Sequence, residues 1–212
     1  MAVSATAFGI VYGLAARNAG LSLPESVAMS VFVFAGASQF AAVGLIAQAV
    51  PWPAILLLTL LLNARHVLYA AALSPWLADR PAHERATVAY VLTDESFALG
   101  LHHFRRVGRA DLPGYWLAAG LIFVPWNLAT IVGVAGGQVI PDPSRLGLDV
   151  IFPAAMVGLA VLLATGRREA IAGVAGVVIA LALGLAVDPA VGVVAGGLGG
   201  PLIAMIPRGG AA

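Results

Sequence analysis

The chain has 212 residues, of which 61% are hydrophobic and only 10% are charged. Soluble domains average about 45–50% apolar and about 25% charged residues, so a water-soluble fold is excluded. The net charge of +1 does not favour nucleic acid as a partner, and the absence of cysteine excludes disulfides, thiolate metal sites and a cysteine nucleophile. The sequence therefore predicts an all-α integral membrane protein.

Apolar segments long enough to be membrane helices, which need about 17–25 residues each, follow one another along the chain. The first is short, and we expect a tilted or half-length helix there, retained because it lacks the features of a secretory signal. No soluble domain or long linker fits between the segments. We therefore expect one polytopic transmembrane domain over residues 1–212 with about seven or eight helices. The segments are Ala2–Ala16, Val27–Val50, Pro51–Leu73, Ala86–Leu101, Tyr115–Val134, Val150–Thr165, Ala170–Val187 and Ala190–Ile206.

A polar interruption divides the second segment. Gly36, Ala37, Ser38 and Gln39 stand in the middle of the apolar run Phe32–Leu45. Glycine-loosened backbone at this depth needs protein or a water-filled cavity around it, and transporters often place their sites at interrupted membrane helices. We therefore expect an interrupted or re-entrant helix near residues 35–40 and a substrate-binding site there. The alternative is that Ser38 and Gln39 are ordinary packing residues between helices.

Charged residues inside two later segments form the second candidate feature. Arg65, with Asn63 and His66 beside it, lies near the middle of its segment, where a charge costs about 2.5–3.5 kcal/mol on insertion scales. Asp94 and Glu95 lie in the middle of the segment Ala86–Leu101 and are the natural partners of Arg65. The alternative is that these residues lie at a membrane interface or form a plain structural ion pair.

Two further patterns concern helix ends and helix contacts. Ser22 is expected to cap a helix in which Pro24 lies in the first turn and Glu25 three residues after the cap. Glycines four residues apart, which allow close helix contact, recur at Gly9 and Gly13, at Gly133 and Gly137, and at Gly192, Gly196 and Gly200.

Arginine gives a weak orientation, because short loops rich in basic residues stay in the cytoplasm. If all eight segments cross the membrane, six arginines share one side and four the other, which favours both termini inside. The six are Arg105, Arg106, Arg109, Arg167, Arg168 and Arg208, and the four are Arg17, Arg80, Arg85 and Arg145.

Five separated motifs run along the chain: Ala19–Ser22 with Glu25, Phe34–Ala42, Leu62–Tyr69, Leu92–Leu99, and Gly147–Asp149 before Phe152. In these motifs the chain resembles the AzlC-type branched-chain amino acid permeases. The resemblance implies an exporter of leucine, isoleucine and valine, with methionine as a further candidate, in the bacterial inner membrane. It also implies a small AzlD-type membrane subunit as partner, and neither enzyme activity nor a cofactor.

We expect different residues of the site to bind different parts of an amino acid substrate. Helix-end amides at Gly36, Ala37, Ser38 and Gln39 would hold a substrate carboxylate, since helix N-termini favour anions. Asp94 or Glu95 would meet the ammonium group, Asn63 would add a polar contact, and Val, Leu and Phe side chains would enclose the apolar chain.

Proton coupling is expected because the chain has no nucleotide-binding loop. Arg65, His66, Asp94 and Glu95 are the groups for a buried charge network. A membrane scaffold subunit, or an uncoupled channel for small zwitterions, remains the alternative, and no metal site is expected.

Overall fold

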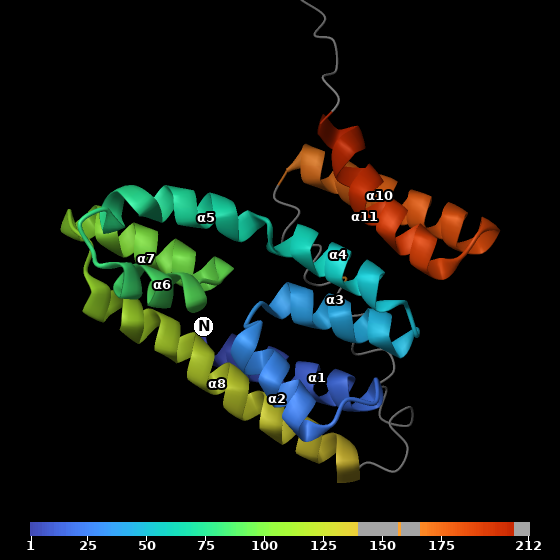
Figure 1. Ribbon diagram of the computed structural model, residues 1–212, viewed down its shortest axis with the longest axis horizontal. Coiled ribbons are helices and arrows are strands. Elements are labelled where there is room, and N and C mark those ends of the chain that lie inside the picture. Colours follow the sequence, from blue (N-terminus) through green and yellow to red (C-terminus); the bar gives the residue numbers. More distant parts are fainter. Residues whose placement is uncertain (140–156, 158–165, 206–212) are drawn as a thin grey trace, which may run out of the picture.

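The computed structural model describes residues 1–139, 157 and 166–205. Every element in this part of the chain is a helix (Figure 1), as expected for an all-α membrane protein. Val150–Thr165, the Gly147–Asp149 motif with Phe152, and Arg145 and Arg208 lie outside the described residues, apart from Val157. The helices are α1 (Ala2–Asn18), α2 (Leu23–Phe32), α3 (Gly36–Ala47), α4 (Trp52–Asn63), α5 (Arg65–Leu73), η1 (Ser74–Leu77), α6 (Ala82–Tyr90), α7 (Asp94–Val107), α8 (Leu112–Val139), α10 (Arg167–Ala186) and α11 (Pro189–Met205).

The segment Val27–Val50 forms two helices rather than one. α2 begins where the Ser22 side chain accepts a hydrogen bond from the Glu25 amide, which confirms the predicted cap. α2 ends at Phe32, and α3 begins at Gly36. The interruption therefore lies at Val33–Ala35, just before the residues at which it was expected, and Gly36–Gln39 form the first turn of α3. Phe34 takes a φ of 40° in the interruption, a left-handed conformation that is uncommon for a residue other than glycine.

The segment Ala86–Leu101 is also interrupted, which the sequence reading did not predict. α6 ends at Tyr90 and α7 begins at Asp94. Asp94 and Glu95 were expected in the middle of a continuous helix, but they open α7 instead. The reason is the side chain of Thr93, which caps α7 by accepting a hydrogen bond from the Ser96 amide, while the Ser96 side chain accepts one from the Thr93 amide.

Three of the described helical stretches are long and apolar enough to cross a bilayer: Trp52–Leu77, Leu112–Gly137 and Arg167–Ala186. The first combines α4, α5 and η1 and bends at Ala64, where α4 passes into α5. Its outer surface exposes large apolar side chains, as expected of a helix in lipid. These include Leu56, Leu60, Val67 and Leu68.

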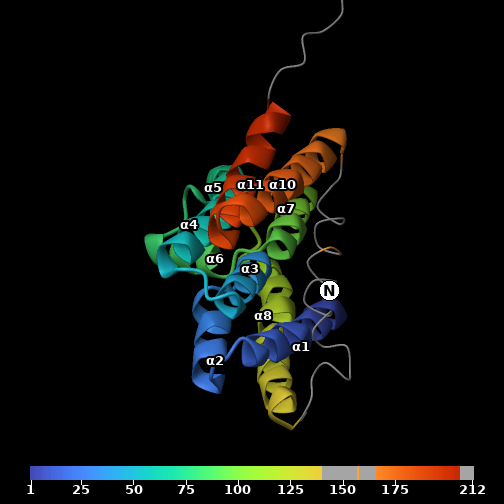
Figure 2. The same cartoon turned by 90° about the vertical axis from the view of Figure 1, so that its right-hand side faces the viewer.

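Close contact between α1 and α8 depends on glycine. A Cβ atom on Gly13 would collide with the Thr130 carbonyl oxygen of α8, and one on Gly133 would collide with the Ile10 carbonyl oxygen of α1. The expected Gly9, Gly13 and Gly133 contacts are therefore confirmed as a backbone-to-backbone seam. α10 and α11 pack in the same way through Gly176, Gly192, Gly196 and Gly200. This second pair stands beside α4 and away from the rest of the bundle (Figures 1 and 2).

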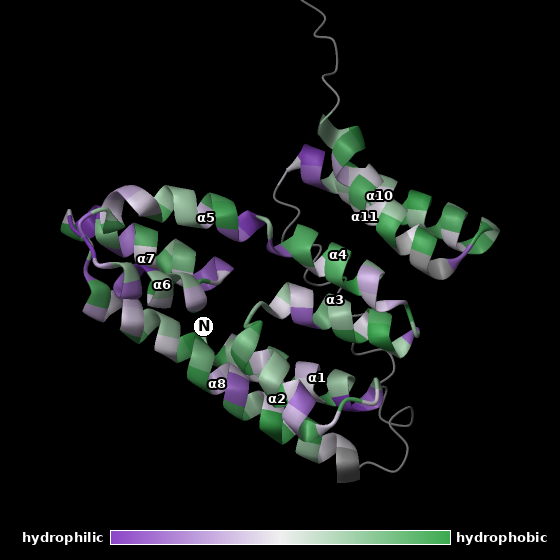
Figure 3. Cartoon of the chain, viewed as in Figure 1, coloured by the Kyte–Doolittle hydropathy of each residue, from purple (hydrophilic) through white to green (hydrophobic). Residues whose placement is uncertain are grey.

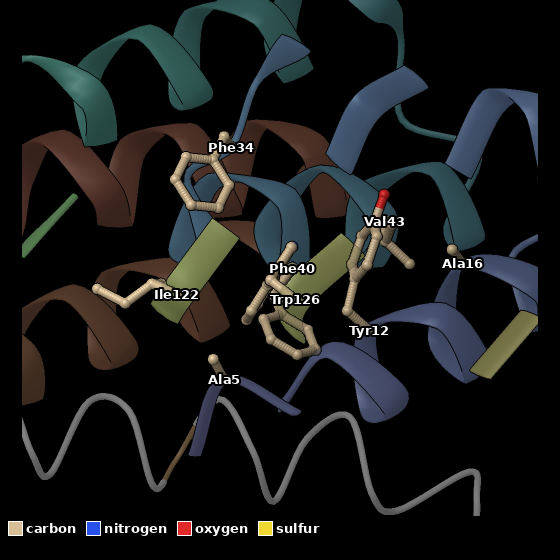
Figure 4. Packing of buried hydrophobic residues seen from close by; sticks show 8 residues of the cluster. All are labelled: Ala5, Tyr12, Ala16, Phe34, Phe40, Val43, Ile122 and Trp126. Atoms are coloured by element: carbon tan, nitrogen blue, oxygen red, sulfur yellow. The ribbon is translucent and has the colours of Figure 1, made fainter. Parts of the chain in front are cut away.

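Two hydrophobic clusters lie on either side of the middle of the molecule. One joins α1, α3 and α8 around Tyr12, Phe40 and Trp126 (Figure 4). The other joins η1, α6, α7 and α8 around Phe104 and Tyr115. Each helix interruption contributes one residue to a cluster, Phe34 to the first and Leu92 to the second, and the site described next lies where the two interruptions meet.

Candidate functional site

A cavity of about 280 Å³ lies where the N-terminal ends of α3 and α7 meet. Both helix interruptions contribute to its wall, although they are far apart in the sequence. Arg65, at the bend between α4 and α5, reaches the same space. The lining residues are Met1, Ser4, Ala5 and Phe8 of α1, Phe34–Ala37 and Phe40 of the first interruption and α3, Arg65, Thr93–Glu95, and Ile122 and Trp126 of α8.

The α3 end of the cavity offers uncapped backbone amides. Ala35 occupies the N-cap position, where it has no side chain able to accept a hydrogen bond. The Gln39 amide is bonded to the Ala35 carbonyl, which leaves the earlier amides of the first turn without a partner from the helix. The helix dipole adds partial positive charge at this end. The arrangement suits an anionic group of a ligand.

The α7 end of the cavity is chemically opposite. Thr93 and Ser96 already satisfy its first amides, and the first turn contains two acids. Asp94 is bound on both oxygens: Arg65 Nη1 lies 3.0 Å from Oδ2, and the Tyr69 hydroxyl donates to Oδ1 at 2.6 Å. The predicted pairing of Arg65 with an acid is thus confirmed, and the partner is Asp94.

Glu95, unlike Asp94, has a carboxylate that is free to bind a ligand. It lines the cavity, its side chain is exposed, and within the described residues it has neither a hydrogen bond nor an ion pair. A carboxylate in this position can bind a cation or exchange a proton. Arg65 also keeps donor capacity, because its Nε atom makes no hydrogen bond to a described residue.

Aromatic and aliphatic side chains form the remaining wall. Phe40 and Trp126 meet edge to face with their ring centroids 6.3 Å apart, and Figure 4 shows Ile122 and Ala5 beside them. The Trp126 indole packs against Gly36: a Cβ atom there would lie 3.1 Å from its Cη2 atom. Glycine at position 36 therefore brings the α3 backbone against the aromatic wall.

The other predicted residues lie nearby but do not line the cavity. The Ser38 hydroxyl donates to Asn63 Oδ1, which ties α3 to the end of α4. His66 Nδ1 lies 3.0 Å from the Asn63 carbonyl oxygen, so both residues hold the bend in place. Gln39 is fully buried, and its amide atoms make no hydrogen bond of good geometry with a described residue, although the Tyr12 hydroxyl is close. Of the predicted site residues, Gly36, Ala37, Arg65, Asp94 and Glu95 reach the cavity.

The sequence reading missed part of the cavity. Phe8, Ile122 and Trp126 look like any apolar residue of a membrane helix, so no pattern separates a wall residue from one in lipid. Thr93 did have a signal, because a threonine three residues before a serine can form a reciprocal cap. The described residues contain no group of three His, Asp or Glu side chains that could hold a metal ion.

In the described part of the chain, an all-helical fold with several helices long and apolar enough to cross a bilayer defines a polytopic integral membrane protein. A family model described as AzlC protein matches residues 1–140, and the chain belongs to the AzlC family. No solved structure matches the chain.

Similar proteins are membrane proteins by name. An uncharacterized membrane protein of Archaeoglobus fulgidus is 31% identical over 194 residues, which cover 91% of this chain and 84% of that protein. An uncharacterized membrane protein of Helicobacter pylori is 26% identical over 82% of this chain and 77% of its own length. The inner membrane protein YgaZ of Escherichia coli is 30% identical over 60% of this chain, and the match spans only 53% of YgaZ.

Proposed function

We propose that this protein exports branched-chain amino acids, namely leucine, isoleucine and valine, with methionine as a further candidate, across the bacterial inner membrane. It would do so as a single transmembrane unit of about seven or eight membrane segments, some of them re-entrant, and not as an enzyme. One observation supports this most: a single cavity combines a helix end of bare amides, a free carboxylate and an apolar wall. An apolar amino acid has the matching three parts.

The substrate carboxylate would bind at the start of α3. The amides of Gly36 and Ala37 point out of an uncapped helix end, and helix N-termini bind anions without needing a positively charged side chain. Arg65 lies on the same cavity and adds positive charge. Half-helix N-termini hold anionic substrate groups in this way in other transporters.

The substrate ammonium group would meet Glu95 rather than Asp94. Arg65 and Tyr69 occupy both oxygens of Asp94, so an ammonium group could bind there only by displacing one of them. Asp94 then acts as a positioning residue that fixes Arg65 and the start of α7. Glu95 is the carboxylate that remains for the substrate or for a proton.

The apolar wall would select the side chain. Phe8 and Ile122 present no hydrogen-bonding group to replace the water that a polar side chain would lose on entering, and Trp126 has only its indole N–H. A small hydrophobic pocket discriminates by about 1–3 kcal/mol per methylene group. Leucine, isoleucine and valine should therefore compete with one another, whereas serine and lysine should not.

Export against a gradient needs an energy source, and we propose the proton gradient with Glu95 as the proton carrier. A small AzlD-type membrane subunit would complete the transporter. A scaffold role offers no reason for a free carboxylate and bare amides in one cavity. An uncoupled channel would continue to move leucine down its own gradient after the proton gradient is collapsed.

Reconstituted vesicles test the proposal. Purified protein is reconstituted into vesicles with and without its small subunit. The vesicles are loaded with labelled leucine, and a pH gradient is imposed across their membrane. The wild type should concentrate leucine, whereas Glu95→Gln should exchange leucine between equal pools but lose concentrative transport. Glu169→Gln is the matched control, because Glu169 also lies in the first turn of a helix but away from the cavity. Concentrative transport by Glu95→Gln at the wild-type rate would refute the assignment of Glu95.

A further inference from the structure

The two helix interruptions are the same structure built twice. Gly36 begins α3 and Asp94 begins α7, and the offset between these two residues also matches the last residues of α2 and α6, Phe32 and Tyr90. The helices on either side follow the same order: α1 comes before the first interruption and α5 with η1 before the second, while α4 and the first part of α8 come after them.

Burial repeats with the same offset. Several positions around the two interruptions are buried in both copies, although most of the residue types differ, while others, such as Phe40 and Ala98, differ in exposure. The pairs that are buried in both copies are Ser30 with Val88, Phe34 with Leu92, Ala35 with Thr93, and Ser38 with Ser96, and the exposed pair is Phe32 with Tyr90.

Each copy forms a hairpin whose tip points at the middle of the molecule. In Figure 1, α2 runs toward the middle and α3 runs back, while α6 and α7 do the same from the opposite end. The tips touch: the Tyr90 hydroxyl donates to the Val31 carbonyl oxygen at 2.6 Å. Both tips line the one cavity.

The distribution of arginine agrees with two hairpins that enter from opposite sides. The loops and helix ends beside α6 and α7 contain Arg80, Arg85, Arg105, Arg106 and Arg109, whereas the corresponding ends beside α2 and α3 contain only Arg17. Figure 3 shows this concentration of hydrophilic residues at the α5, α6 and α7 end. The weak bias of six to four expected for eight straight spans becomes five to one at the two hairpin bases, which places the α6–α7 end in the cytoplasm.

We propose that α1–α4 and α5 to the middle of α8 are two copies of one unit, inverted in the membrane. Each unit inserts a re-entrant hairpin into the shared cavity, α2–α3 from outside the cytoplasm and α6–α7 from inside. Inverted repeats around a site at the membrane midplane are the architecture that allows alternating access. The two tips are therefore the outer and inner gates, a part of the inference that rests on the proposed transport function.

Cysteine labelling tests the topology, and the natural chain is suited to it because it contains no cysteine. Four exposed positions at the hairpin bases are changed singly: Asn18→Cys, Gln48→Cys, Ala78→Cys and Arg106→Cys. A membrane-impermeant maleimide should label positions 18 and 48 in intact cells, and positions 78 and 106 only after permeabilisation. Val107→Cys tests the same helix end as Arg106→Cys without removing an arginine. Each variant is checked for a single peak in size-exclusion chromatography.

Other labelling patterns would overturn the inference. If positions 18 and 48 were on opposite sides, the α2–α3 segment would cross the membrane rather than return. If all four positions were labelled from one side, the two units would not be inverted. Neither result depends on whether the protein transports anything.

The gates are tested separately with Ala37→Cys, because Ala37 lines the cavity. The impermeant maleimide should reach this position from each side of oriented proteoliposomes, and added leucine should slow the reaction. Access from one side only, together with the expected pattern at the four outer positions, would refute alternating gates and leave the topology in place. Labelling that leucine does not slow would contradict the proposed substrate alone.

Discussion

The two helix starts at the cavity have the same backbone plan but opposite chemistry. α3 begins at Gly36 with no capping side chain, while α7 begins at Asp94 behind a reciprocal Thr93 and Ser96 cap. The uncapped end keeps its partial positive charge for a ligand, and the capped end places two carboxylates where the equivalent positions of α3 have only glycine and alanine. The α7 start is thus stabilised by its own side chains, whereas the α3 start lacks a cap and keeps the amides that the proposed carboxylate site would use.

Removal of Arg65 should have the largest effect, because only the α7 end depends on an ion pair. Loss of one partner from a buried pair costs about 3–5 kcal/mol, against about 0–1 kcal/mol for an exposed pair. The Arg65 and Asp94 side chains are 22% and 35% exposed, so Arg65→Ala should destabilise the protein by an amount between these ranges. Thermal unfolding in detergent measures the change.

The double variant sharpens this prediction. Arg65→Ala with Asp94→Asn leaves no unpaired charge, and it should be more stable than Arg65→Ala alone. Arg85→Ala is the control, since Arg85 is an exposed arginine of α6. Equal melting temperatures for the single and double variants would show that the pair does not hold α7.

Loss of the α7 cap should have a smaller effect on stability. Thr93→Ala removes the acceptor for the Ser96 amide, and replacement of such a cap by alanine costs about 0.5–2 kcal/mol. Thr87→Ala is a suitable control, because Thr87 lies inside α6 and bonds only to carbonyls of its own helix. If Thr93→Ala and this control had equal melting temperatures, the cap would not stabilise the start of α7, and the two helix starts would not differ in this respect.

Addition of a cap to α3 should have the opposite sign. Ala35→Ser supplies the missing acceptor and should stabilise the protein by about 0.5 kcal/mol, at the low end of the usual range because Ala35 is 4% exposed. The new hydroxyl would occupy an amide proposed for the substrate carboxylate, so leucine affinity should fall at least about tenfold. Ala41→Ser, on the same helix, should change neither property. Unaltered leucine binding by Ala35→Ser would argue against carboxylate recognition at α3.

The smallest effect is expected at an acid outside the cavity. Asp111 lies 2.7 Å from His103 Nε2, and this hydrogen bond lowers the pKa of Asp111 below its usual value. Because the pKa is lower in the folded protein, the stabilisation is present above the pKa of the unfolded chain and is lost as pH falls through that of the folded protein. Asp111→Asn should therefore lower the melting temperature slightly at pH 7 and not at all in strong acid. A difference that grows toward low pH would contradict this.

The sequence predicted the elements that have a local chemical signal. The Ser22 cap, the glycine seam of α1 and α8, and a partner for Arg65 could each be found from a few neighbouring residues. The interruption near Gly36 was found because glycine and polar residues break an apolar run, but its position was late by a few residues. The strained residue is Phe34, whose conformation depends on packing that the sequence does not show.

The second interruption was missed because Val91, Leu92 and Thr93 contain neither glycine nor proline. The repeat was missed for a related reason: it preserves burial and helix ends, while most side chains have changed. Trp126 and Ile122 were missed for a similar reason, since the sequence does not show whether an apolar residue of a membrane helix faces lipid or a cavity. These features depend on tertiary structure, and only coordinates place them.

The seam between α1 and α8 has a consequence for how the cavity can change shape. Backbone packs directly against backbone at Gly13 and Gly133, and because close-packed contacts of this kind resist deformation, we expect these two helices to act as a frame. Phe8 and Ala5 on one helix, and Ile122 and Trp126 on the other, must then stay in register while the hairpin tips move. The proposed recognition of the apolar side chain would then be separate from the proposed opening motion. A substrate would contact the same α1 and α8 side chains when it enters the cavity and when it leaves.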